Sequence, residues 1–117
     1  MAEPRELLSA NLHQVFGNRN GLSRQQAIDA TYTDDIVFTD PEGAVTGRDA
    51  LAAKAAALIE GAPADFDFAE DGIAYSGADS GALAWTFGPS GNPVARGIDL
   101  ITVRDGRISE LRTLLSE

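Results

Sequence analysis

The order of the two hydrophobic periodicities along the chain is the feature that most constrains its fold. Helical spacing of apolar residues dominates the first half, interrupted by one short alternating stretch at 34–40. Alternation typical of strands dominates the second half, where Gly, Asp, Asn and Pro separate the segments, as at 88–93 and 104–107. Helices followed by a run of strands predict an α+β domain, in which the helices cover one face of a curved, mostly antiparallel sheet.

Helices are predicted ahead of most of the sheet, at 4–18, at about 24–32 and at 46–61. The second begins with a capping box formed by Ser23 and Gln26, and Thr46 is the expected N-cap of the third. A long helix packed across such a sheet can leave a cavity. The residues on the inner faces of the strands then indicate what lines it.

Composition narrows the range of functions. With 117 residues, 44% of them hydrophobic, the chain is predicted to form one domain over 1–117 with a hydrophobic core. A net charge of −9 and a pI near 4.4 argue against nucleic acid as a partner, because such a surface repels phosphate. The absence of cysteine excludes disulfides and thiol nucleophiles and fits a cytoplasmic location. The sequence contains neither a signal core nor a run of membrane-spanning length, so no membrane partner is expected.

Asp99 is the one polar residue on an otherwise apolar face of a predicted strand. In the stretch PVARGIDLITV, Ala95, Gly97, Ile101 and Val103 share its parity. Burial raises the pKa of a carboxyl group and suits it to acid or base catalysis. The alternative is a structural role, in which a buried Asp99 bonds to the backbone or to an arginine.

Asp40 ends the strand predicted at 34–40, and Ile36 and Phe38 share its parity. The sequence DPEG that begins at this residue matches a type I turn. Two interpretations follow. The side chain of Asp40 caps the turn and does nothing else, or the turn also directs it into the cavity beside Phe38, as a general base.

Aromatic side chains supply the bulk of the predicted lining. Trp85 shares strand parity with Leu83 and Phe87, a stripe typical of a core and, where the core is hollow, of a ligand site. His13, the only histidine, falls outside the apolar stripe of the first helix and is expected at the surface. One histidine and scattered carboxylates make a poor zinc site, so neither a metal nor a cofactor is predicted.

Two stretches resemble the nuclear transport factor 2-like superfamily, and especially its SnoaL-like and ketosteroid isomerase-like branch. One is YTDDIVFTDPEGAVTGRDAL, with an aromatic residue, paired acids, a short strand, Asp-Pro and a glycine ahead of the third helix. The other is AWTFGPSGNPVARGIDLITVRDGRISELRTLL, with an aromatic strand, a Gly/Pro loop, Gly-x-Asp and a hairpin. The resemblance covers nearly the whole chain. It implies a conical fold with an apolar pocket, and a homodimer that pairs through the outer sheet face.

The resemblance also implies roles for individual residues. In ketosteroid isomerase an Asp at the Asp-Pro position transfers the proton, and a second carboxylic acid and a tyrosine stabilise the dienolate oxygen. By this likeness Asp40 is the base and Asp99 the protonated acid of a cofactor-free isomerase or cyclase. Its substrate would be a small hydrophobic ketone that is steroid-, polyketide- or terpenoid-like. The expected substrate-binding residues are Phe16, Tyr32, Phe38, Tyr75, Trp85 and Phe87.

One position departs from the isomerase pattern. Phe16 aligns with the hydroxyl-donating tyrosine, and phenylalanine has no donor. Loss of one oxyanion donor typically costs about 2.7–4 kcal/mol of transition-state stabilisation. A noncatalytic small-molecule binding or dimerisation module is therefore one alternative function. An epoxide hydrolase or dehydratase is another, but its Asp–Arg–Asp set would need Arg96 and Asp99 on one strand face, and residues three apart face opposite ways.

Overall fold

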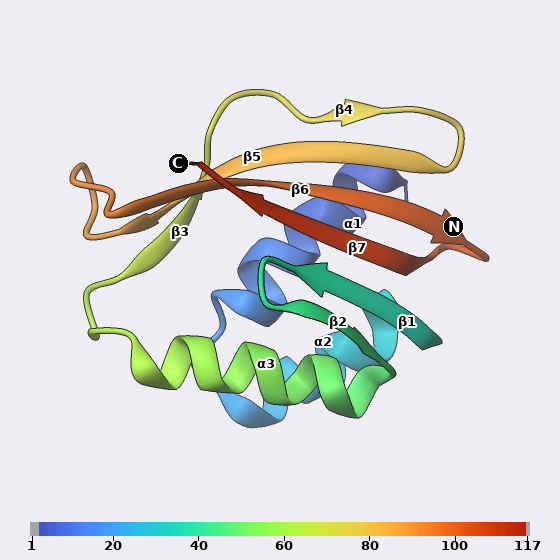
Figure 1. The fold of residues 1–117 in the computed structure, drawn as a ribbon, viewed down its shortest axis with the longest axis horizontal. Helices are drawn as coiled ribbons and strands as arrows, with labels where there is room; N and C mark the ends of the chain where they lie inside the picture. Colours follow the sequence, from blue (N-terminus) through green and yellow to red (C-terminus); the bar gives the residue numbers. More distant parts are fainter. Residues whose placement is uncertain (1–2, 117) are drawn as a thin grey trace.

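A seven-stranded sheet curves over the helices in the computed structural model of the protein, which describes residues 3–116 (Figure 1). The strands are β1 (Tyr32–Asp40), β2 (Gly43–Thr46), β3 (Asp67–Glu70), β4 (Tyr75–Ser76), β5 (Ser80–Gly88), β6 (Ala95–Arg104) and β7 (Arg107–Leu115). They follow the order β2-β1-β7-β6-β5-β3, and β4 pairs with β5. β1 and β7 are parallel, whereas the other pairings are antiparallel. The predicted α+β fold with a mostly antiparallel sheet is confirmed.

The helical segments are α1 (Pro4–Ala10), η1 (Asn11–Phe16), α2 (Gly21–Thr31) and α3 (Arg48–Gly61). The helix predicted over 4–18 is therefore an α-helix that continues as the π-helical segment η1. The Gly17 N–H closes this segment by donating to the Leu12 carbonyl, five residues back, at 2.8 Å. A Cβ at position 17 would lie 2.8 Å from the same oxygen, so a glycine fits here.

Both predicted N-caps are wrong. α2 starts three residues earlier than expected, because the Asn20 side chain accepts a hydrogen bond from the Ser23 N–H at 3.0 Å. α3 starts after Gly47, whose φ of 98° suits glycine. Thr46 does not cap α3 because it belongs to β2, a strand the sequence does not predict, and pairs there with Val37.

Helices and strands enclose the core between them. Figure 1 shows α1 and η1 lying beneath β5, β6 and β7, with α3 beneath the β1–β2 hairpin. There, buried side chains from alternate positions of the strands pack against buried side chains of the helices. These core residues are Leu8, Leu12, Val15, Ile28, Ile36, Phe38, Leu51, Ile59, Leu83, Trp85, Ile101, Ile108 and Leu111. The alternation of period two therefore assigns the inner strand faces as the sequence predicts.

The predicted hairpins are also present. Asp105 and Gly106 adopt φ values of 54° and 76° between β6 and β7, the backbone of a type I′ turn. The loop at 88–93 joins β5 to β6. None of the helices among residues 3–116 has the length and apolarity needed to cross a membrane.

Candidate active site

A cavity of about 430 Å³ lies between the inner face of the sheet, η1 and α3. Its wall is mainly apolar, with Leu12, Phe16, Phe38, Pro41, Ala57, Leu58, Phe68, Trp85, Phe87, Ala95 and Leu115. Its polar members are Asp40, Glu42, Lys54, Asp99 and Thr113. Four of the six predicted substrate-binding residues, namely Phe16, Phe38, Trp85 and Phe87, thus meet both predicted catalytic carboxyls around one space.

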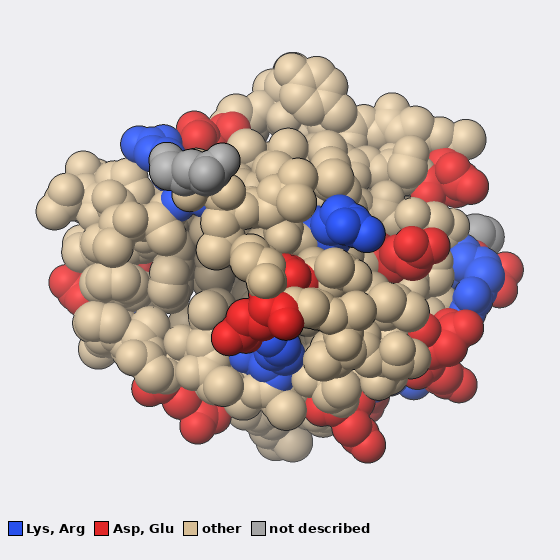
Figure 2. Space-filling model, viewed as in Figure 1, with Lys and Arg blue, Asp and Glu red and all other residues tan. Residues whose placement is uncertain are grey.

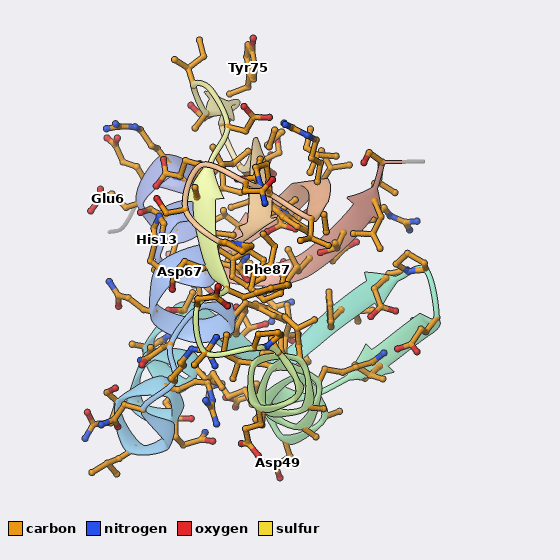
Figure 3. All side chains as sticks on the ribbon, turned by 90° about the vertical axis from the view of Figure 1, so that its left-hand side faces the viewer. Glu6, His13, Asp49, Asp67, Tyr75 and Phe87 are labelled. Carbon is orange, nitrogen blue, oxygen red and sulfur yellow. The ribbon has the colours of Figure 1, made fainter. Side chains whose placement is uncertain are left out.

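Edge-to-face and stacked aromatic contacts fix the shape of the wall. Phe16 of η1 meets Phe38 of β1 with ring centroids 5.5 Å apart. Phe68 of β3 stacks on Phe87 at 4.2 Å and meets the Trp85 ring edge-to-face at 5.2 Å. Such aromatic pairs stabilise the fold beyond the contribution of their buried apolar area. Figure 3 shows Phe87 in the space between the sheet and α3.

The two tyrosines predicted to bind substrate lie elsewhere. Tyr75 is on the short strand β4 with 68% of its surface exposed, and Figure 3 shows it at the edge of the molecule farthest from α3. Tyr32 is fully buried, and its hydroxyl donates to Asn11 Oδ1. Burial, and to a smaller extent the charge of Asp99, raises the pKa of Tyr32 well above its usual value. Neither tyrosine is part of the cavity wall, so Phe16 is not replaced by either hydroxyl.

Asp99 is held by two neutral donors. The Asn11 Nδ2 donates to Oδ2 at 2.9 Å, and the Thr113 hydroxyl donates to Oδ1 at 2.7 Å. β6 and β7 place Thr113 directly opposite Asp99, so their side chains share the inner face. Burial raises the pKa of Asp99, and the hydrogen-bonding groups of Thr113, Trp85 and Asn11 only partly oppose that rise. The neutral carboxylic acid is thereby favoured.

The indole of Trp85 lies beside this carboxyl group without a good hydrogen bond to it. Its Nε1 is buried and has no hydrogen-bond partner among residues 3–116. It lowers the pKa of Asp99, although the pair does not meet the geometry of a hydrogen bond.

Asp40 both caps its turn and lines the cavity, which is the placement that the second interpretation expects. Its Oδ1 accepts the Glu42 N–H at 2.9 Å, and its Oδ2 accepts from Lys54 Nζ at 3.0 Å. The side chain is 16% exposed. Each carboxylate oxygen has two lone pairs, so one acceptor site on each remains for a substrate proton.

Lys54, the only lysine of the chain, is a site residue that the sequence analysis missed. Its ammonium also pairs with Glu42 at 2.6 Å, and these contacts, Glu42 before Asp40, raise its pKa. In Figure 2, acidic and basic side chains meet over the tip of the β1–β2 hairpin and α3. Lys54 and Asn11 share one signal: each is a polar residue at helical spacing within an apolar stripe, Lys54 between Leu51 and Leu58.

Other candidate groups stay outside the cavity. Arg96 is 57% exposed and pairs with Asp71 at 3.5 Å, so it does not join Asp99 in an Asp–Arg–Asp set. His13 is 43% exposed and contacts Glu70 at 2.9 Å, as a surface residue. Within residues 3–116, no three His, Asp or Glu side chains are grouped so as to hold a metal ion.

Asp99→Asn is expected to stabilise the protein at neutral pH. Because the pKa of Asp99 is raised in the folded state, the folded protein keeps a proton that the unfolded chain releases. Wild-type stability therefore falls as the pH rises from the ordinary Asp value of about 3.9 through the raised one. An asparagine stays neutral, can accept from Asn11 and can donate to Thr113.

Urea unfolding of both proteins across pH checks this expectation. The difference in the free energy of unfolding should vanish below about pH 3 and grow to a plateau above the raised pKa. A difference that is the same at every pH would mean that Asp99 titrates alike in both states.

Comparison with known proteins places this chain in a family. A family model described as a SnoaL-like domain matches residues 12–111. No curated protein sequence matches the chain. Among solved structures, a candidate isomerase of the SnoaL-like family from Agrobacterium tumefaciens superposes with a TM-score of 0.85 at 19% identity, over 95% of each chain.

Two further structures share the fold. A candidate SnoaL-like polyketide cyclase from Jannaschia has a TM-score of 0.77 at 18% identity, covering 95% of this chain and 83% of its own. A candidate ketosteroid isomerase from Kribbella flavida has a TM-score of 0.74 at 16% identity, covering 97% and 78%. At these identities the likeness shows the fold alone, whereas the family match spans most of the sequence. The chain belongs to the SnoaL-like family.

Proposed function

We propose that the protein is a cofactor-free isomerase that moves a proton within a small, flat, hydrophobic ketone. The observation that carries this proposal is the contrast between two carboxyl groups in one apolar cavity. Asp40 is paired with an ammonium group, whereas Asp99 has only neutral partners and is buried. A carboxyl group that bonds an ammonium group and another that is buried among neutral donors differ in the way that a base and an acid require.

The reaction would proceed through an enolate. Asp40 takes a proton from the carbon alpha to the carbonyl, and the electron pair of that C–H bond moves to the carbonyl oxygen. Asp99, as the neutral acid, donates a hydrogen bond to this oxygen while its charge develops. In a β,γ-unsaturated ketone, the proton then returns from Asp40 to the γ-carbon and gives the conjugated isomer. No atom is gained or lost, so no co-reactant is needed.

Charges near the cavity support a neutral substrate. Asp40, Glu42 and Lys54 together carry one net negative charge beside it, on a protein of net charge −9. An anionic ligand would be repelled, whereas a neutral ring would contact the apolar wall. The names of the structural relatives, candidate isomerases and a candidate cyclase, agree with chemistry at a carbonyl compound.

Conversion of 3-cyclohexen-1-one to its conjugated isomer, followed by ultraviolet absorbance, tests the proposal. Wild type should accelerate it, and Asp40→Asn and Asp99→Asn should each lower kcat/KM by about 100-fold or more. Asp71→Asn is the matched control, because Asp71 pairs with the exposed Arg96 and should leave turnover unchanged. Unchanged turnover in both Asp40→Asn and Asp99→Asn would contradict the proposed mechanism.

A noncatalytic binding module is the second candidate, favoured by Phe16. This residue lines the cavity where the isomerase-like site would have a hydroxyl group. In that case the wild type would bind flat ligands, Asp40→Asn would bind them equally well, and neither would isomerise the ketone. Asp40 would then serve only its turn and its ion pair with Lys54.

A further inference from the structure

Thr113 is a polar residue of the cavity wall that the proposed reaction does not use. An enolate oxygen is best stabilised by two donors, and Asp99 alone offers one. Phe16 has no donor, and the buried Tyr32 hydroxyl is committed to Asn11. The indole nitrogen of Trp85 is covered by its neighbours and therefore out of reach of a ligand.

The hydrogen bonds around Asp99 fix where its proton lies. Tyr32 donates to Asn11 Oδ1, so the amide group of Asn11 is turned with its Nδ2 toward Asp99. Oδ2 of Asp99 accepts an N–H that the bond to Tyr32 fixes in place, whereas Oδ1 accepts from the Thr113 hydroxyl, which can rotate away. The proton of the neutral acid is therefore on Oδ1, which is the oxygen 2.7 Å from the Thr113 hydroxyl.

Thr113 Oγ1 and Asp99 Oδ1 are thus two hydroxyl oxygens side by side on the cavity wall. The pairing of β6 with β7 sets their spacing, because Asp99 and Thr113 are directly opposite in register. A third oxygen at a normal hydrogen-bond length from both would complete a triangle with sides of about 2.7 Å. In this structure the two groups bond to each other.

We propose that Thr113 is the second oxyanion donor. Together with Asp99, its hydroxyl binds the carbonyl or enolate oxygen of the substrate and supplies the hydroxyl group that Phe16 lacks. This inference rests on the proposed function for its substrate class. When the ligand arrives, the Thr113 hydroxyl turns from Asp99 Oδ1 to the ligand oxygen, and Asp99 donates to the same atom. This rotation of the Thr113 hydroxyl moves one hydrogen and no heavy atom.

Binding of 2-naphthol, compared with 2-methylnaphthalene of the same shape, isolates the contribution of the oxygen. Isothermal titration calorimetry would give both dissociation constants for wild type, Thr113→Val and Thr113→Ser. We expect Thr113→Val to lower the naphthol preference about tenfold, because valine keeps the shape and removes the hydroxyl. Thr113→Ser, which retains the hydroxyl, should retain the preference.

Phe87→Leu is the control for packing. Phe87 lines the cavity without a polar group, so this change should weaken both ligands and leave their ratio within about twofold. A Thr113→Val protein with the wild-type ratio overturns the inference, as does a wild type without any preference for naphthol. The same Thr113→Val protein, tested on 3-cyclohexen-1-one, should lose kcat/KM about tenfold or more.

The failures of the two proposals are distinguishable. If Thr113→Val abolishes the naphthol preference but the wild type isomerises no ketone, the oxygen site stands and the proposed reaction fails. If Asp40→Asn and Asp99→Asn abolish turnover while Thr113→Val has no effect on preference or turnover, the reaction stands and Thr113 is not a donor.

Discussion

Replacing Gly97 by alanine is expected to destabilise the protein by about 3 kcal/mol, the upper end of the usual cost of overpacking. Gly97 pairs with Trp85 across β5 and β6, and the indole ring lies over its bare backbone. A Cβ there would be 2.5 Å from Trp85 Cζ2 and 2.7 Å from the Leu114 carbonyl oxygen. Both contacts are too short, so the ring must move and the backbone of β7 must shift as well.

Urea unfolding followed by fluorescence measures this effect directly, because Trp85 is the only tryptophan. The native-state emission should change as well, since the ring leaves its contact with Phe68. Gly61→Ala is the matched control: Gly61 ends α3, and a Cβ there meets nothing within 4 Å. It should keep or raise stability by about 0.5–1 kcal/mol. Equal stability of the two variants would mean that the sheet absorbs the clash at position 97.

Asn11→Leu is expected to cost about 2–6 kcal/mol, because it leaves two buried groups without a partner. The Tyr32 hydroxyl loses its acceptor and Asp99 Oδ2 loses its donor. Each buried unsatisfied polar group costs about 1–3 kcal/mol. The free energy of unfolding in urea gives the loss, and the leucine side chain keeps the site apolar and filled.

A double substitution separates this cause from a packing defect. Tyr32→Phe alone removes a hydroxyl and leaves Asn11 Oδ1 unpaired. When it is added to Asn11→Leu, it removes a group that is already orphaned, so the double variant should be about 1–3 kcal/mol more stable than the sum of the single effects predicts. Strict additivity would indicate that the Tyr32–Asn11 bond contributes nothing to stability.

Strand parity explains why both carboxyl groups could be found from the sequence. A side-chain period of two assigns Asp40 and Asp99 to inner faces as soon as their strands are recognised, and the parity of Trp85 and Phe87 follows in the same way. The turn after Asp40 could also be predicted, because Asp, Pro and Gly have distinct positions in it. The homodimer and the cytoplasmic location remain predictions.

The missed residues depend on contacts between distant parts of the chain. Asn11 and Asp99 are 88 positions apart, and only the packing of η1 on β6 shows that one bonds the other. In the sequence, Lys54 is part of an Ala-rich helix and gives no sign of a partner. Only the fold shows that the β1–β2 hairpin places Asp40 and Glu42 next to it. Tyr75 is exposed on the short strand β4, and its predicted place among the substrate-binding residues is wrong.

The π-helical turn of η1 has a consequence for how this fold tolerates insertions and deletions. In a regular α-helix, residues five apart point about 140° away from each other. The i→i+5 turn brings such residues onto one side, so Asn11 can reach Asp99 while Phe16 reaches Phe38. Loss of a single residue between them would leave Asn11 and Phe16 four apart in a regular α-helix, about 40° apart and still on one face. This segment thus differs from an ordinary helix by the length of one residue, so the gain or loss of that residue would leave both side chains facing the cavity.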